Sequence, residues 1–211
     1  MIERSFGTGA RARIEAAVRE AEARTTGQIV PLVVERSAGY PEARYRGALL
    51  GAAVVTVGAL ASRFPLTLAE LTVLQLAAAV LGALLALWGP VERVLAGRTE
   101  LELAARERAL RAFHEQGLHR TVDGTGVLLF ASLFERRAIV LGDHGIHARI
   151  GDAEWQRAVA ALVAGMRRGD PAGGFCEAIA LCGERLREHF PAAPGTPPRN
   201  ELEDALRTPP G

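Results

Sequence analysis

Two long apolar runs stand out in the first half of the chain, separated by a short polar stretch. They cover Gly47–Ser62 and Leu71–Gly89, and neither contains a charged residue. As helices they would be about 24 Å and about 28 Å long, close to the roughly 30 Å hydrocarbon core of a bilayer. The pattern predicts a transmembrane helical hairpin, which we place at residues 41–92.

A helical hairpin buried in a soluble core is the alternative. Soluble core helices of this length usually carry a polar edge. Here only Thr56, Thr72 and Gln75 interrupt the two runs, and they form no continuous stripe. Small residues in both runs would let two membrane helices pack closely, and they leave open a homo-oligomer formed through the hairpin.

The segment before the hairpin has the pattern of one helix and one strand. Apolar residues recur at helical spacing within Thr8–Arg24, and Gln28–Glu35 reads as a buried strand. Pro31 interrupts that strand and lacks a backbone N–H, so it predicts a sheet edge or a bulge there.

The segment after the hairpin continues an α/β pattern. A charged helix begins at Thr99, and the short apolar runs Val127–Phe130 and Ala138–Leu141 predict a β-hairpin. Two amphipathic helices follow, starting near Asp152 and Asp170. We therefore expect one α/β domain divided into residues 1–40 and 93–190, followed by a disordered proline-rich tail at residues 191–211.

The charged residues indicate where the protein is located in the cell, and they do not indicate a ligand or a reaction. The formal net charge is only +1, which gives no electrostatic argument for binding nucleic acid. The N-terminus lacks the apolar segment of a secretory signal peptide. Arginines flank the hairpin on both sides, whereas the turn between the apolar runs holds only Arg63. The positive-inside rule then predicts a multi-pass protein of the cell inner membrane with its domain and both termini cytoplasmic.

Candidate chemistry is concentrated in the stretch VLGDHGIHARIGD, residues 140–152. Asp143 and Asp152 lie within it, and Asp123 precedes the first strand of the predicted β-hairpin, either beside this stretch or at the opposite end. Three carboxylates with loop carbonyls would suit calcium, and adding His144 and His147 would shift the preference toward zinc or manganese. No other cofactor is indicated.

A purely structural interpretation accounts for the same residues. Asp143 would accept hydrogen bonds from backbone N–H groups in a turn, and Asp152 would cap a helix. Gly145 would then take a positive φ angle between the two histidines. Two further histidines, His114 and His119, lie near a helix C-terminus, where imidazoles favour the helix dipole.

Motifs for enzymatic catalysis are missing from the sequence. It contains no G-x-S-x-G, no G-x-x-x-x-G-K-[ST] and no C-x-x-C. If the protein is an enzyme, a metal-activated phosphatase using Asp123, Asp143 and Asp152 is the reaction class that the acids support.

Several stretches in a fixed order resemble the TPM domain family. They are ARTTGQIVPLVVERS, DGTGVLLFASLFERRAIVLGDHGI and IGDAEWQRAV, which resemble successive parts of that domain. The resemblance implies an α/β/α sandwich around a small mixed sheet, here interrupted by the transmembrane hairpin. It also implies calcium binding and acid phosphatase activity. One departure is the glycine-rich turn, commonly G-x-G-L-E in the family, where His144 and His147 enter instead of the acid.

We expect from these features an integral membrane protein whose cytoplasmic domain binds a membrane-protein partner, in membrane-protein maintenance. A calcium-dependent acid phosphatase is the alternative, because only an enzyme requires converging acids. A third hypothesis is a structural anchor whose tail after Pro191 recruits a partner.

Overall fold

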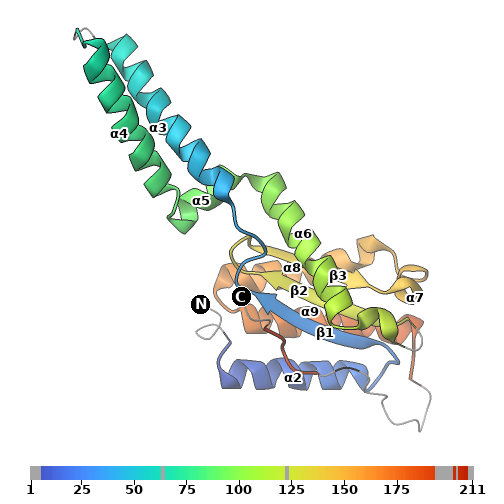
Figure 1. Ribbon diagram of the computed structural model, residues 1–211. Helices are drawn as coiled ribbons and strands as arrows, with labels where there is room; N and C mark the ends of the chain where they lie inside the picture. Colours follow the sequence, from blue (N-terminus) through green and yellow to red (C-terminus); the bar gives the residue numbers. More distant parts are fainter. Residues whose placement is uncertain (1–5, 63–64, 122–123, 193–201, 203, 209–211) are drawn as a thin grey trace. The chain divides into compact units, whose positions relative to one another are not determined.

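The chain forms two compact units. The first, which we call the domain, contains residues 1–37 and 104–211; the second, the hairpin unit, contains residues 38–103. The computed structural model is shown in Figure 1, and it describes residues 6–62, 65–121, 124–192, 202 and 204–208.

A three-stranded mixed sheet forms the centre of the domain, with the order β1-β2-β3. β1 (Gln28–Val34) pairs in parallel with β2 (Gly126–Ser132), and β2 pairs antiparallel with β3 (Arg137–Gly142). The predicted β-hairpin and the small mixed sheet are thus confirmed. Every residue of β1 and β2 is buried, as expected for strands covered on both faces.

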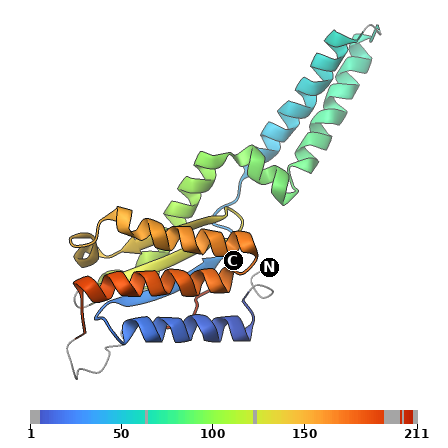
Figure 2. The same cartoon turned by 180° about the vertical axis from the view of Figure 1, so that it is seen from behind.

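Helices cover both faces of this sheet. One face packs against α2 (Thr8–Glu22), α8 (Asp152–Arg168) and α9 (Pro171–His189), which lie side by side in Figure 2. The other face packs against apolar residues of α6 (Arg98–Glu115), which is followed by the short 3-10 helix η1 (Leu118–Arg120). Side chains of a strand alternate between faces, so successive residues of β1 enter different cores: Ile29 and Val33 on the first face, Val30, Leu32 and Val34 on the second.

The hairpin unit consists of α3 (Pro41–Ala61), α4 (Leu68–Leu85) and the short α5 (Gly89–Ala96). Glycines allow α3 and α4 to approach closely. A Cβ atom at Gly51 would lie 2.1 Å from the carbonyl oxygen of Ala78, and one at Gly82 would lie 2.1 Å from the carbonyl oxygen of Gly47. Any side chain at these positions would force the two backbones apart.

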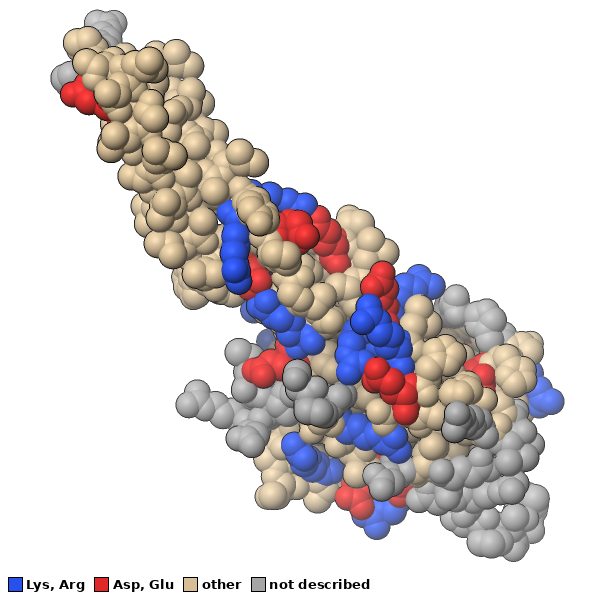
Figure 3. Space-filling model, in the orientation of Figure 1, with Lys and Arg blue, Asp and Glu red and all other residues tan. Residues whose placement is uncertain are grey.

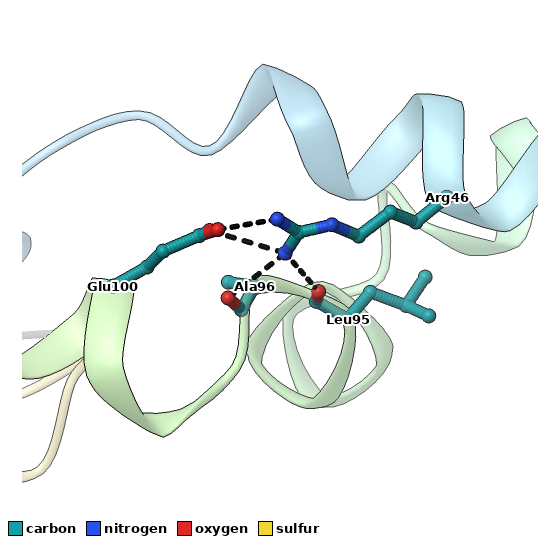
Figure 4. A network of polar contacts seen from close by, with 4 residues as sticks. All are labelled: Arg46, Leu95, Ala96 and Glu100. Atoms are coloured by element: carbon teal, nitrogen blue, oxygen red, sulfur yellow. Dashed lines mark hydrogen bonds and ion pairs between the residues drawn. The ribbon is translucent and has the colours of Figure 1, made fainter.

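Arg46 fixes the base of α3 within the hairpin unit (Figure 4). Its Nη1 donates to the carbonyl oxygens of Leu95 and Ala96 at 2.6 and 3.0 Å, and its guanidinium also pairs with the Glu100 carboxylate. A cation at this place satisfies carbonyls that the end of α5 leaves without helical partners.

Most large apolar side chains of the hairpin face outward. Figure 3 shows a long uncharged surface along it, and no residue of α4 is buried. The alternative, a hairpin buried in a soluble core, does not agree with this exposure of the described residues. Among the described residues, α4 is the one helix long and apolar enough to cross a membrane by length and composition. α3 begins with Glu42, Arg44 and Arg46, so its apolar part is shorter.

The outer edge of β1 is closed by other parts of the domain. The Ile29 N–H donates to Glu22 Oε1 at 2.6 Å, and the Val33 N–H donates to the Arg207 carbonyl oxygen at 3.0 Å. Pro31 lies between them without an N–H, and its carbonyl oxygen accepts from Arg207 N at 3.0 Å. The expectation that Pro31 marks a sheet edge is confirmed.

Part of the C-terminal tail is folded, contrary to the expectation of disorder. Arg207 forms a parallel bridge with Leu32, and Leu206 is only 5% exposed within the core beneath α2 and α9. An apolar side chain and an open strand edge thus order a segment that composition alone marks as disordered. The expectation for residues 193–201, 203 and 209–211 concerns positions outside the described residues.

Glu22 is a buried acid beside this edge. It follows Ile14 and Val18 at four-residue intervals and is 6% exposed. Burial raises the pKa of Glu22 to about 8; the hydrogen bond from Ile29 lowers it, and the neighbouring Asp204 carboxyl raises it further. The proton on Glu22 therefore stabilises the fold.

We expect the stability of the protein to fall as pH rises from about 4.5 to about 8. In this window the unfolded chain ionises Glu22 while the folded chain keeps its proton, at a cost on the order of 1.4 kcal/mol per pH unit. Glu22→Gln should flatten that dependence. Urea unfolding across this window, followed by Trp155 fluorescence with Trp88 replaced by phenylalanine, measures it. Glu20→Gln, at an exposed position of α2, is the control, and an equal flattening there would contradict the assignment.

Candidate functional site

The predicted metal site lies at the end of β3, where the chain turns into the one-turn helix α7 (His144–His147). Asp143 occupies the N-cap of α7, and its backbone N–H donates to the Gly126 carbonyl oxygen at 2.9 Å. The β2–β3 pairing thereby fixes the position of this carboxylate.

The two oxygens of Asp143 have different environments. Oδ1 accepts the His144 N–H at 2.7 Å and lies 3.1 Å from His144 Nδ1. Oδ2 is buried and has no hydrogen-bond partner in the described structure. Asp143 itself is 7% exposed, so water reaches it poorly. A buried carboxylate oxygen without a partner is costly and is a natural ligand position for a cation.

Gly124 closes the same turn from the other side. It has a φ of +62°, and a Cβ atom there would lie 2.6 Å from His144 Cε1. The segment entering β2 and the segment leaving β3 therefore meet, with the exposed His144 ring against Gly124.

Three of the five predicted ligands lie outside what the structure describes. Asp123 is not described, and neither are the side chains of His147 and Asp152. Within the described residues, no group of three histidine, cysteine, aspartate or glutamate side chains forms a possible metal cluster. Asp143 and His144 are the predicted ligands that the structure brings together, and the full set of five stays a prediction.

The structural interpretation of these residues is confirmed for Asp143 and wrong in two details. The N-cap of α8 is Gly151, and Asp152 is the first helical residue. Gly145 lies inside α7, and the positive φ angle of this turn belongs to Gly124 instead. The error at Gly145 arises because the chain forms an extra turn of helix, α7, where the sequence indicated a loop.

His114 and His119 pack against each other. Their ring centroids lie 5.1 Å apart, near the end of α6 and within η1. This is consistent with the helix-terminus interpretation of both residues.

A second buried acid lies at the opposite end of the sheet. Glu135 is 3% exposed, accepts the Ser37 N–H at 3.0 Å and accepts a hydrogen bond from the Ser132 hydroxyl. The Ser37 hydroxyl donates to Ser132 Oγ at 2.9 Å. Both carboxylate oxygens of Glu135 are thus used by the domain itself, which indicates a structural role in holding the end of β1.

Two clefts in the domain lie away from Asp143. One, of about 340 Å³, lies between α2 and α9 and includes Arg24 and Arg187. The other, of about 450 Å³, includes Arg136 and Arg167 beside apolar Met166. Arg136 has a φ of +53° in the β2–β3 turn.

The geometry defines a class of protein: an α/β domain with helices on both faces of a mixed sheet and a helical hairpin inserted between β1 and β2. Residues 93–185 match the family model of the TPM domain. This matched part of the chain is similar to the TPM domain family, which is the resemblance that the sequence motifs indicated.

A solved structure shows the same fold. The chain is similar to the BA42 protein from the psychrophilic bacterium Bizionia argentinensis, determined by NMR, with a TM-score of 0.60 and 17% sequence identity; the match covers 99% of each chain. No curated protein matches the sequence.

The unpaired Oδ2 of Asp143 predicts that calcium binds at this turn. Asp143→Asn keeps the side-chain shape and the cap but removes the charge, so it should weaken calcium binding at least about tenfold, the effect of a 1.4 kcal/mol loss. Calorimetric titration of calcium, then zinc and manganese, into the metal-stripped protein measures this.

Asp170→Asn provides the matched control, because Asp170 caps α9 by accepting the Gly173 N–H at 2.9 Å. It should leave calcium binding unchanged. No heat with any of the three metals, or equal losses in both variants, would contradict a cation site at Asp143.

Proposed function

We propose that this protein is a membrane-anchored TPM protein whose hairpin crosses the bilayer twice and whose domain binds partner proteins. The apolar exterior of the hairpin carries the proposal. Leu49, Val54, Leu60, Leu68 and Leu76 are all more than 60% exposed. Soluble proteins rarely expose a continuous apolar surface of this kind, and a bilayer would cover it.

The polar side chains within the hairpin support a membrane environment. Gln75 Nε2 donates to Thr56 Oγ1 at 2.8 Å across the two helices. The hydroxyls of Thr56 and Thr72 donate to the Ala52 and Leu68 carbonyl oxygens within their own helices. Polar groups inside a bilayer need internal partners of this kind, because the hydrocarbon offers none.

The pairing of β1 with β2 supports two crossings rather than one. These strands lie on opposite sides of the hairpin in sequence but pair in one sheet. The chain must therefore return to the membrane face it left. A crossing by α4 requires a second crossing, and α3 is the helix available for it. Arg46 at its base can reach polar surroundings while its stem lies along apolar surface.

The distribution of arginines supports a cytoplasmic domain. Arg36, Arg44 and Arg46 precede the apolar part of α3, and Arg93, Arg98 and Arg106 follow α4. We place the domain and both termini in the cytoplasm and the turn after α3 outside the inner membrane.

Arginines in the middle of α4 should remove the protein from the membrane. Leu76→Arg with Val80→Arg puts two charges on one exposed stripe of the helix, at a combined cost of about 6 kcal/mol for insertion. The fraction of protein that resists alkaline extraction from membranes should fall sharply. Leu110→Arg, at a partly exposed position of α6 in the domain, should have no such effect. A wild-type protein released by alkaline extraction would overturn the membrane anchor.

A cysteine in the turn should react from outside the cell. Leu66 is the better position, because Thr67 caps α4 through reciprocal hydrogen bonds with Glu70. Leu66→Cys in a variant lacking Cys176 and Cys182 should react with an impermeant thiol reagent in cells whose outer membrane has been permeabilised and whose inner membrane is intact. Glu20→Cys in the same background should react only after lysis, and the reverse pattern would invert the proposed orientation.

We further propose that the domain acts by binding a membrane-protein partner, in the maintenance of membrane proteins, as the resemblance to the TPM domain family led us to expect. Copies of the chain would associate through the hairpin. Gly47, Gly51 and Gly82 lie at the contact between α3 and α4. A Cβ atom at Gly58 would meet no atom of the described residues within 4 Å, so this position is available for contacts with a second copy.

A metal-dependent phosphatase is the second candidate function, and Asp143 Oδ2 is the observation that favours it. A calcium ion at this carboxylate would supply the positive charge that phosphate hydrolysis requires. This function predicts calcium-dependent hydrolysis of p-nitrophenyl phosphate at acid pH, lost in Asp143→Asn and kept in Asp170→Asn. Calcium binding without hydrolysis would reject the phosphatase.

A further inference from the structure

We propose that the outer edge of β1 is a docking site for an extended peptide of a partner protein. The chain's own segment Asp204–Arg207 is then a displaceable occupant of that site. The inference deepens the proposed partner binding, on which it rests, by naming the surface and the chemistry of the partner.

The outer edge of β1 offers an added strand one main-chain donor and one main-chain acceptor. The Val33 N–H and the Pro31 carbonyl oxygen point outward, and both are used by Arg207, each at 3.0 Å. The outward Ile29 N–H is taken by the Glu22 side chain. An added strand can therefore form two main-chain hydrogen bonds at this edge. It cannot form a longer ladder, because Pro31 supplies no donor. Peptide recognition by strand addition uses main-chain groups of this kind.

Side chains on either side of these two hydrogen bonds give the docking site its specificity. Leu206 inserts into the core that contains α2 and α9, the Asp204 carboxyl lies by Glu22, and the Arg207 guanidinium donates to Gln116. The bridge between Arg207 and Leu32 is parallel. The partner is thus an extended peptide, parallel to β1, with an acid, then an apolar residue two positions later, then an arginine.

Three features make the resident segment displaceable. Besides the side-chain contacts of Asp204 and Arg207, it is held by only two main-chain hydrogen bonds and one deeply buried apolar side chain. Within the described residues, the Nε atom of Arg207 is buried without a hydrogen-bond partner, which costs the closed state free energy. Pro209 and Pro210 follow closely in sequence and cannot donate to a longer ladder.

The segment regulates access to the edge because it is tethered. Eleven residues separate Ala192 from Asp204 in the sequence, so the segment competes with a free peptide as an intramolecular ligand. A free peptide binds the closed protein weakly and the opened protein tightly.

Peptide binding to the full-length protein in detergent tests this. The probe is a fluorescent peptide with the sequence of residues 200–211, and its anisotropy reports binding. Leu206→Asp in the protein releases the resident segment and should strengthen peptide binding at least tenfold over wild type. Leu110→Asp on α6 should bind as wild type does, and a peptide with alanine for its leucine at position 206 should not bind the opened protein.

Hydrogen exchange on the unaltered protein provides a second measurement that does not depend on the folding of the variant. The Val33 amide should exchange faster than the Leu32 amide, which alternation directs toward β2, and excess peptide should slow it. Equal protection of the two amides, or equal peptide affinity of wild type and Leu206→Asp, would overturn the docking site. Membrane anchorage is measured independently by alkaline extraction, so a failure of the docking site would leave the proposed membrane anchor unaffected.

Discussion

The parallel pairing of β1 with β2 is the constraint on which the rest of the structure depends. Parallel neighbours need a crossover connection, and here that connection contains the whole hairpin unit as well as α6. Because β1 and β2 belong to one sheet, the chain must return to that sheet after the hairpin. Arg46 holds the start of α3 to the end of α5, so the two ends of the insertion are tied together within the hairpin unit itself.

Much of this architecture could be predicted from local patterns. Two long charge-free runs predicted α3 and α4, and short apolar runs predicted the strands, because each of these signals lies within one element. Pro31 even indicated the edge position of β1, since a residue without an N–H is excluded from the middle of a sheet. The apolar exterior of the hairpin followed from the lack of a polar stripe around Thr56 and Gln75.

Contacts between segments distant in sequence could not be predicted in this way. Glu22 lay at four-residue spacing from Val18, which pointed inward, but nothing local showed that it would meet Asp204. The proline-rich composition of the tail predicted disorder. The open edge of β1 and the site filled by Leu206 order its segment Asp204–Arg207 instead. At the candidate site, the sequence pointed to Asp143 and His144 as neighbours in one turn, whereas their relation to Gly124 depends on the register of β2 against β3.

The place of the insertion also has a consequence for biosynthesis. The 91 residues between Val34 and Gly126 must be made before β1 can find its neighbour. At about 5–20 residues per second, translation of this stretch takes roughly 5–20 s. During that time the apolar hairpin has left the ribosome while β1 is still unpaired. The sheet can therefore close only after the whole hairpin unit has been synthesised, because β2 lies beyond it in the sequence.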